Sequence, residues 1–341
     1  MHDKKLVVIG SNSFSGSHFV DKALNCGYEV MGISRSEEPL PIFLPYTWIK
    51  NKNEISKNKF VFKKFDLNQH LDLIIRSIDT FEPSYIVNFA AQGMVAESWM
   101  NPTHWYKTNV VSQVALHDEL RKKEYLEKYV HVTTPEVYGS TDKGWIDEKT
   151  NFSPSTPYAV SRAACDLHLQ SFYQAYKFPV TFTRAANVYG PGQQLYRIIP
   201  RTILSALSGR KMKLHGGGLS TRCFIHINDV IEATLKIMTD AKPGTSWHLS
   251  NREEISIRKL VEKICELCDV NFSKVVDISE ERLGKDQSYL LSSNAIREAF
   301  KWEEKIDLIS GIKETINWID CNYDLLCKLP WDYVHKIWEL L

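Results

Sequence analysis

A hydroxyl, a carboxylate and a phenol stand in two short segments of the chain. Thr134 and Glu136 are two positions apart, and Tyr158 and Arg162 are four positions apart in the segment that follows. A carboxylate can take or return a proton, and so can a phenol whose pKa is brought toward neutrality. Residues four apart share one helix face, so we expect the Arg162 cation to lower the pKa of Tyr158. The pattern predicts proton transfer from an alcohol.

A turn near the N-terminus predicts a dinucleotide site. It reads Gly10-Ser11-Asn12-Ser13-Phe14-Ser15-Gly16, after an apolar run and at the start of a helical pattern. Glycines let the backbone approach a pyrophosphate, whose charge is received by the helix N-terminus. Ser13 stands where a middle glycine would stand, and a turn that binds no ligand has a similar sequence.

The end of the second apolar run bears on which dinucleotide binds. An NAD site usually has an acidic residue there for the ribose 2′-hydroxyl. This chain has Ser34-Arg35-Ser36, a cation between two hydroxyls, which suits a 2′-phosphate. We therefore expect NADP, with NAD possible because Glu37 and Glu38 follow at once.

The elements that must position these residues alternate between two hydrophobic periods. We expect strands at 6–9, 29–34, 60–65, 85–89, 129–133 and 180–183, and helices at 14–24, 70–79, 102–120 and 157–176. This alternation predicts an α/β fold, a doubly wound parallel sheet with ligands at the carboxyl ends of its strands. Beyond residue 190 the pattern gives way to shorter elements. We expect a dinucleotide-binding domain over 1–190 and a smaller α/β substrate lobe over 191–341, with the chain crossing back between them.

Composition excludes several classes of protein. The 341 residues include 42 lysines and arginines against 41 aspartates and glutamates, a net charge of +1. Such a balance argues against nucleic-acid or membrane-surface binding. No run approaches a membrane span, and an apolar strand pattern begins at once, so we expect a cytoplasmic protein. Seven cysteines at irregular spacing are not a disulfide framework, and we expect Cys265 and Cys268 to pack in a core rather than bind metal.

Together these residues resemble the extended short-chain dehydrogenase/reductases that modify nucleotide-sugars, most of all the NDP-hexose 4,6-dehydratases of the dTDP-glucose and GDP-mannose types. The resemblance covers about Lys5 to Trp318. Besides the glycine turn and the Thr134/Tyr158 pairing, its marks are Asp66-Leu67, Asn88-Phe89-Ala90-Ala91-Gln92, Asn109, Arg184 to Pro191, Arg222 to His226, and Arg282 before Gly284-Lys285-Asp286.

The resemblance implies a Rossmann-type fold and a role for each residue at a matching position. Thr134, Glu136, Tyr158 and Arg162 would be catalytic. The dinucleotide would be bound by Gly10, Asn12, Ser13, Phe14, Ser15, Gly16, Arg35, Asp66, Leu67, Ala90, Ala91, Asn109, Tyr158 and Arg162. The nucleotide-sugar would be bound by Gln92, Ser98, Asn187, Arg197, Arg222 and Arg282.

The implied reaction is a lyase reaction without net oxidation. Tyr158 would deprotonate the sugar 4-hydroxyl while C4 gives up a hydride, Glu136 would take the C5 proton, water would leave from C6, and the hydride would return there. The product is an NDP-4-keto-6-deoxyhexose. The resemblance also implies a homodimer formed through the helices at 102–120 and 157–176.

Three departures from the dehydratase pattern leave other reactions open. Pro135 stands where many dehydratases have an acid, Arg162 replaces the usual lysine, and Met94 replaces a common histidine. An NDP-uronate decarboxylase or NDP-sugar epimerase of the same fold is the alternative, and a decarboxylase would need Arg184, Arg197 or Arg201 for the sugar carboxylate. A binding protein without catalysis is a third hypothesis. We expect His131 and His226 to be structural, and the aromatic tail at 331–341 to be a helix that packs on the domain or on a second subunit.

Overall fold

A seven-stranded parallel sheet forms the centre of the computed structural model, which describes residues 4–48, 59–141, 144–280 and 288–335. The strand order is β11-β6-β5-β4-β1-β2-β3, and every neighbouring pair is parallel. The strands are β1 (Lys5–Ile9), β2 (Glu29–Ser34), β3 (Phe60–Lys64), β4 (Tyr85–Asn88), β5 (Lys128–Thr133), β6 (Val180–Ala185) and β11 (Ser246–Leu249). The strand order reverses between β1 and β4, which confirms the doubly wound Rossmann-type fold. In such a fold the ligand crevice lies at the carboxyl ends of the strands where the order reverses.

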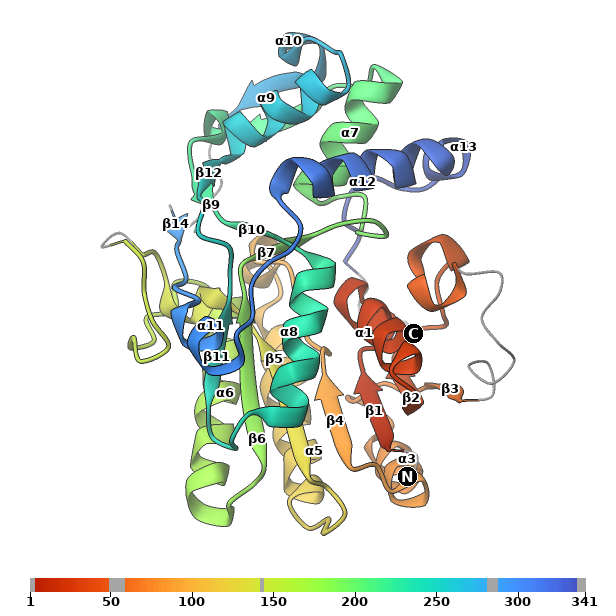
Figure 1. Ribbon diagram of the computed structural model, residues 1–341, viewed down its shortest axis with the longest axis vertical. Coiled ribbons are helices and arrows are strands. Elements are labelled where there is room, and N and C mark those ends of the chain that lie inside the picture. Colours follow the sequence, from red (N-terminus) through yellow and green to blue (C-terminus); the bar gives the residue numbers. More distant parts are fainter. Residues whose placement is uncertain (1–3, 49–58, 142–143, 281–287, 336–341) are drawn as a thin grey trace.

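Helices cover both faces of this sheet (Figure 1). One face is covered by α3 (Leu71–Phe81), α5 (Ser112–Leu120) and α6 (Pro157–Tyr176), and the other by α1 (Phe14–Asn25) and α8 (Ile227–Asp240). Successive side chains of a strand point to opposite faces. Val7 and Ile9 therefore lie in the first core, and Leu6 and Val8 lie in the second. This double burial explains the unbroken apolar strands of the sequence.

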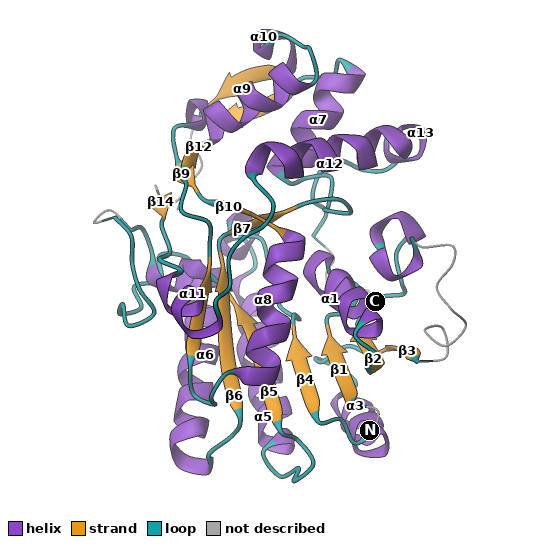
Figure 2. Ribbon diagram, in the orientation of Figure 1, coloured by secondary structure: helices purple, strands orange, loops and turns teal. Residues whose placement is uncertain are grey.

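A smaller lobe lies above the carboxyl ends of the strands (Figure 2). Its helices pack through a separate apolar core that includes Leu204, Leu260, Ile264, Ile312 and Ile319. Its elements include α7 (Ile198–Ser208), α9 (Ile257–Leu267), α10 (Phe272–Val275), α12 (Leu308–Cys321) and α13 (Tyr323–Leu326), with β8 (Met212–His215) paired to β13 (Val276–Ser279). Short strands below it are β7 (Asn187–Tyr189), β9 (Thr221–Arg222), β10 (Phe224–His226), β12 (Ile255–Ser256) and β14 (Ser288–Tyr289), beside α11 (Asn294–Phe300).

The six expected strands are confirmed, and the expected helices differ in detail. The helix expected at 102–120 is divided into α4 (Pro102–Tyr106), a π-helical turn η4 (Lys107–Val111) and α5. The connection after β2 holds the turns η1 (Pro41–Phe43) and η2 (Pro45–Thr47), and its residues 49–58 lie outside the described chain. Cys265 packs in an apolar cluster on α9, as expected. Residues 331–335 of the expected tail helix are not helical, and 336–341 lie outside the described chain.

Candidate active site

The glycine turn brings three backbone segments unusually close together. Gly10 has a φ of 82°, and a Cβ there would lie 2.7 Å from the backbone nitrogen of Ala90. A Cβ on Gly16 would lie 2.2 Å from the carbonyl oxygen of Gly10. Ser13 caps helix α1 by accepting from Gly16 N at 3.0 Å, and its hydroxyl donates to Gly10 O at 2.7 Å. The middle position of the turn therefore does not need a glycine, because the serine serves as the helix cap.

The end of β2 is tied to this turn. The backbone nitrogen of Asn12 donates to Ser34 Oγ at 2.9 Å, and its side-chain amide donates to the carbonyl oxygens of Ser36 and Glu37 at 3.0 Å. Arg35 is exposed and donates to Gln92 Oε1 at 3.2 Å.

The acidic residues that follow Arg35 are engaged elsewhere. Glu37 pairs with Lys64 at 3.1 Å, and the Glu38 carboxylate accepts from the Tyr46 hydroxyl. Neither interaction involves the glycine turn.

The turn fits the diphosphate of a dinucleotide. Helix α1 has no acidic residue in its first turn, and the first N–H groups of a helix have no acceptor within it. The buried Oδ1 of Asn12 has no hydrogen-bond partner within the described chain. The close approach at Gly10 and Gly16 lets the turn pack tightly against the backbone of Ala90 and against itself, with no room for a side chain at either glycine. A helix N-terminus with these features binds phosphate groups.

Asn109 joins the loop after β4 to helix α6, which carries Tyr158. It is fully buried in the π-helical turn η4, a kind of turn found frequently at functional sites. Its Oδ1 accepts from Gln92 N at 2.7 Å, and its Nδ2 donates to Gln92 O at 3.0 Å and to Ser161 Oγ at 3.0 Å. The side chain predicted to bind the cofactor thus makes protein contacts on both sides, and it fixes the loop after β4 against α6.

The other residues expected to bind the dinucleotide lie just after the ends of strands β3 and β4. Asp66 and Leu67 follow β3 and are buried, and Asp66 Oδ1 accepts from Asn68 N at 2.8 Å. Ala90 and Ala91 follow β4, where the Ala90 nitrogen donates to Asn88 Oδ1 at 2.9 Å.

The three residues predicted to transfer protons, Thr134, Glu136 and Tyr158, lie together where β5 ends. Thr134 caps the short turn η5 (Pro135–Tyr138), accepting from Glu136 N at 3.4 Å, and its side chain hydrogen-bonds Tyr158. Helix α6 begins at Pro157, capped by Thr156, which accepts from Ala159 N at 3.2 Å. Tyr158 therefore lies in the first turn of α6, close enough to Glu136 for the carboxylate to affect its titration. The sequence prediction that groups these three residues agrees with this geometry.

The expected lowering of the Tyr158 pKa is wrong. Burial raises the pKa of Tyr158 above its ordinary value, and the Glu136 carboxylate raises it further. Arg162, the hydrogen bond from Thr134 and Arg197 lower the pKa, but they do not outweigh burial and Glu136. The four-residue spacing places Tyr158 and Arg162 on one helix face, but the spacing alone does not show how deeply Tyr158 is buried.

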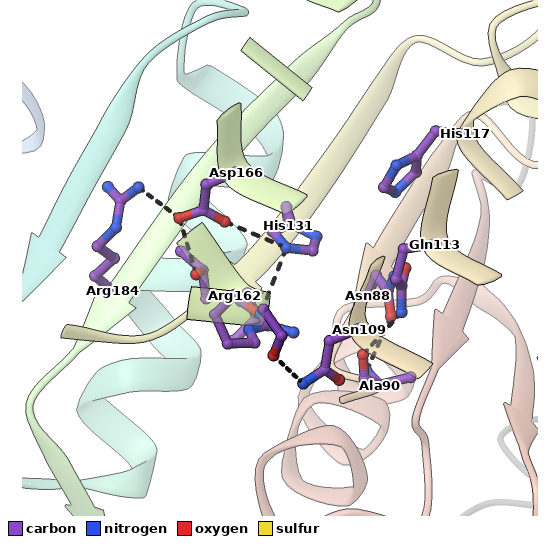
Figure 3. Close-up of polar contacts among 12 residues, drawn as sticks. Asn88, Ala90, Asn109, Gln113, His117, His131, Arg162, Asp166 and Arg184 are labelled. Atoms are coloured by element: carbon purple, nitrogen blue, oxygen red, sulfur yellow. Dashed lines mark hydrogen bonds and ion pairs between the residues drawn. The ribbon is translucent and has the colours of Figure 1, made fainter. Parts of the chain in front are cut away.

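Arg162 points into a buried polar network beneath α6 (Figure 3). Its guanidinium donates to Val132 O and lies 3.4 Å from His131 Nε2. His131 Nε2 lies 3.5 Å from Asp166 Oδ1, and Asp166 Oδ2 pairs with Arg184 at 2.7 Å. The Nε and Nη1 atoms of Arg162 are buried without a partner in the described part of the chain. The arginine is therefore anchored on one side and has donors left on the other.

Sequence reasoning missed Asp166 as a functional candidate. It lies four positions after Arg162 on α6 and is completely buried, where it also accepts from Thr133 Oγ1 at 3.0 Å. The sequence signal that could have identified it is an acidic residue one helical turn after Arg162. His131, which we expect to be structural, is completely buried, and burial followed by Arg162 hold its pKa well below the usual value. His226, also expected to be structural, caps α8 by accepting from Asn228 N at 3.3 Å.

The candidate substrate residues lie on both sides of the crevice. Gln92 and Ser98 are buried in the loop after β4, and the Ser98 hydroxyl donates to Val95 O at 2.6 Å. Asn187 begins β7, and its backbone nitrogen donates to Cys223 O at 3.0 Å. Arg222 is buried on β9, 4.4 Å from the ring of Tyr289. Arg282 lies outside the described residues.

The three arginines considered for a sugar carboxylate differ sharply. Arg184 is buried and paired with Asp166. Arg201 pairs with Asp332 at 3.3 Å. Arg197 is exposed at the start of α7, and its charge affects the titration of Tyr158. Arg197 is therefore the one of these three that is both exposed and close to the proton-transfer residues.

Known proteins resemble this chain over nearly its whole length. The family model for GDP-mannose 4,6 dehydratase matches residues 7–315. A human dTDP-D-glucose 4,6-dehydratase is 31% identical, with 98% of this chain and 94% of the relative covered. A dTDP-glucose 4,6-dehydratase of Xanthomonas campestris is 26% identical, with 92% of each covered.

Solved structures agree with these relatives. A dTDP-glucose 4,6-dehydratase from Streptomyces venezuelae, with NAD and TYD bound, has a TM-score of 0.85 and 25% identity over 94% of this chain and 98% of that one. The Bacillus anthracis dTDP-glucose 4,6-dehydratase in complex with NAD has a TM-score of 0.83 and 28% identity, with 94% and 98% covered. This chain therefore belongs to the GDP-mannose 4,6-dehydratase family of the extended short-chain dehydrogenase/reductases.

Proposed function

We propose that this protein is an NDP-hexose 4,6-dehydratase, a lyase that forms an NDP-4-keto-6-deoxyhexose. The observation that carries the proposal is the meeting of Thr134, Glu136 and Tyr158 at the carboxyl end of β5, beside a turn that fits a dinucleotide. A protein that only bound the nucleotide-sugar would have no use for this trio.

The chain's own residues supply the proton transfers. Tyr158 removes the proton from the sugar 4-hydroxyl, and Thr134 hydrogen-bonds the phenol. A nicotinamide dinucleotide, held at the glycine turn, would supply the hydride acceptor for C4 and the hydride donor for C6. Burial and Glu136 raise the pKa of Tyr158 in the ligand-free protein, while Arg162 and Arg197 oppose this effect. Arg162 keeps two buried donors that have no partner among the described residues, one helical turn from Tyr158.

Glu136 carries out both halves of the elimination. It takes the proton from C5, which the C4 ketone has acidified, and its carboxyl group then gives that proton to the departing C6 hydroxyl, which leaves as water. When hydride reaches C6, a proton from solvent water completes C5. Pro135, next to it, has no proton to donate, so one carboxyl must act as base and then as acid. Glu136 is half-buried at the mouth of the sheet, where it can face the sugar ring.

The remaining substrate contacts complete the proposal. Glycine turn residues and Arg35 hold the cofactor, for which we favour NADP over NAD, because Arg35 is exposed and Glu37 and Glu38 have other partners. Gln92, Ser98, Asn187, Arg197, Arg222 and Arg282 hold the nucleotide-sugar. In this division of labour, residues 1–190 supply cofactor binding and chemistry, and 191–341 supply most of the substrate contacts, with β11 crossing back to the large sheet.

We also propose a cytoplasmic homodimer. Apolar side chains are exposed on and beside the segments at 102–120 and 157–176, including Met100, Val111, Val160 and Leu167. Their burial against a second copy would remove apolar surface from water. All seven cysteines are free, which suits a reducing compartment, and no helix among the described residues is both long and apolar enough to cross a bilayer.

A panel of NDP-hexoses and NDP-uronates, followed by mass spectrometry, tests the activity. We expect loss of water from an NDP-hexose. Loss of carbon dioxide from a uronate would make the protein a decarboxylase, for which exposed Arg197 is the available cation. An unchanged mass with an altered sugar NMR spectrum would make it an epimerase, and no turnover with retained cofactor binding would make it a binding protein.

A further inference from the structure

The described end of the chain forms a segment, residues 331–335, that we call the C-terminal clasp. Its first residue is fixed to the smaller lobe. Trp331 is buried, its Nε1 donates to Leu326 O at 3.0 Å, and the guanidinium groups of Arg201 and Arg210 lie 5.4 Å and 5.0 Å from its ring centre. The clasp therefore starts from a firm anchor.

The clasp then leads, without helix or strand and with a bend at Asp332, toward the nucleotide-binding domain. Asp332 and Val334 are exposed, whereas Tyr333 and His335 are half-buried. The ring of Tyr333 packs edge-on against Tyr196 of the smaller lobe at 5.3 Å. Its hydroxyl reaches the loop after β4, so this one side chain contacts both lobes.

A continuous chain of hydrogen bonds links the clasp to the predicted 2′-phosphate site. Arg35 donates to Gln92 Oε1 at 3.2 Å, and Gln92 Nε2 donates to Tyr333 Oη at 3.2 Å. Tyr333 Oη lies 3.3 Å from His335 Nδ1, and His335 Nε2 lies 3.0 Å from His104 Nδ1. Every donor meets an acceptor when His335 carries its proton on Nε2, which is the tautomer that this network selects.

These contacts determine which atom of the Gln92 side-chain amide is the oxygen and which is the nitrogen. Arginine has only donors, so Gln92 must turn its oxygen toward Arg35. The Tyr333 proton is directed to His335, so the tyrosine oxygen accepts the amide nitrogen. The backbone of Gln92 is held by Asn109 on both its N–H and its carbonyl. Gln92 is buried, and an amide this constrained holds the exposed Arg35 in one place.

The base of the clasp is also fixed. The His335 ring stacks on Trp105 with 5.1 Å between ring centres and an interplanar angle of 17°. Trp105 is fully buried, and its Nε1 donates to Gly93 O at 2.9 Å. The far end of the hydrogen-bond chain therefore rests on the domain that carries Gln92.

We propose that Tyr333 is a positioning residue for cofactor selection: its hydroxyl fixes Gln92, and through Gln92 it holds Arg35 where the 2′-phosphate of NADP binds. The inference rests on the proposed cofactor site and assigns the aromatic tail a part in it. A dinucleotide without the 2′-phosphate makes no use of Arg35, so Tyr333 should affect NADP⁺ affinity and leave NAD⁺ affinity nearly unchanged.

The test is direct titration of the full-length protein with NADP⁺ and NAD⁺ in the absence of sugar. Tyr333→Phe keeps the ring on Tyr196 and removes one hydroxyl, so we expect NADP⁺ to bind about fivefold more weakly, the effect of one lost hydrogen bond. NAD⁺ should bind about equally to both proteins. His335→Phe, which keeps a ring on Trp105, should weaken NADP⁺ in the same sense, because Tyr333 loses its acceptor.

Tyr176→Phe is the matched control, since this tyrosine is exposed at the end of α6 and should leave both affinities unchanged. Equal NADP⁺ affinity in Tyr333→Phe and the unmodified protein would overturn the inference, and so would equal weakening of both dinucleotides. If the unmodified protein binds NADP⁺ but Tyr333→Phe changes nothing, only the inference fails. If the unmodified protein binds neither dinucleotide, the proposed function fails with it.

Discussion

Two arginines of the candidate site are held in opposite ways. Arg162 lies in a dry, charged network with His131, Asp166 and Arg184, all of them completely or almost completely buried. Arg35 is exposed and is held by the neutral chain of Gln92 and the C-terminal clasp. Removing one member of a buried ion pair leaves an uncompensated charge, whereas removing one partner at the surface exposes the other to water.

The two regions should therefore contribute to different properties, the buried network to the stability of the fold and the clasp to the affinity for the cofactor. The network beneath α6 keeps the chemical groups in place and is inseparable from the fold. The clasp is built from side-chain hydrogen bonds and stacked rings at the lobe junction, so it can change affinity while the fold persists. Variants in the first region should lower the stability of the fold or change the chemical step, and variants in the second should change binding by small factors.

The largest effect is expected from Asp166→Asn. It removes the carboxylate that pairs with Arg184 at 2.7 Å in a fully buried position. We expect the free energy of unfolding, measured in denaturant, to fall by about 3–5 kcal/mol. Asp118→Asn is the control, because Asp118 pairs with Arg121 and Lys122 on the surface of α5. Similar stabilities of the two variants would show that the buried network is not special.

The pH dependence of stability should differ between the two regions. Burial and Arg162 hold the pKa of His131 well below 6.5, so the unfolded chain binds this proton at a higher pH than the folded protein does. The contribution of neutral His131 to the free energy of unfolding is fully present above about pH 6.5. Below that pH it falls by about 1.4 kcal/mol per pH unit. His131→Gln should flatten this acid loss, whereas His335→Gln should change it little because His335 is half-buried. An identical acid slope in His131→Gln and unmodified protein would contradict the prediction.

Catalytic pH dependence should follow the charges around Tyr158. Glu136 raises the pKa of Tyr158, so Glu136→Gln should lower it and move the pH-dependent rise of C4 oxidation to lower pH. This variant still permits the first half-reaction, which can be followed by absorbance of the reduced dinucleotide in a single turnover. Arg162→Met removes a lowering charge and should move the same rise to higher pH. Shifts in the reverse directions would show that other groups control the titration.

The smallest effect is expected at the edge of the clasp. Asp332→Asn breaks the pair with Arg201 at 3.3 Å, in which the Asp332 side chain is 87% exposed. We expect the free energy of unfolding to change by about 0.5 kcal/mol or less. A loss as large as that of Asp166→Asn would mean that the clasp is as integral to the fold as the buried network.

Much of the fold follows from local sequence patterns. Strands such as β1 and β5 are recognisable because burial on both faces demands unbroken apolar runs. The positions of Thr134, Glu136 and Tyr158 also follow, since strand ends and helix starts of one sheet edge converge. These features depend on neighbours along the chain and on a topology that the alternation already implies.

The remainder depends on contacts between distant residues. The rise in the Tyr158 pKa comes from burial that no spacing reveals. Tyr333 meets Gln92 from 241 positions away, and residues 331–335 are not helical although their spacing predicts a helix. The π-helical turn that carries Asn109 interrupts a pattern that predicts one continuous helix, and Asn109 contacts Gln92 and Ser161, which are distant in the sequence.

The central claim is that Glu136 removes the C5 proton of an NDP-hexose and that water then leaves from C6. Its most direct test is turnover in D₂O, with the product examined by mass spectrometry and NMR. We predict a product that lacks one water and carries one deuterium at C5, and no water loss with Glu136→Gln. Water loss without deuterium at C5, or undiminished water loss in Glu136→Gln, would contradict the account.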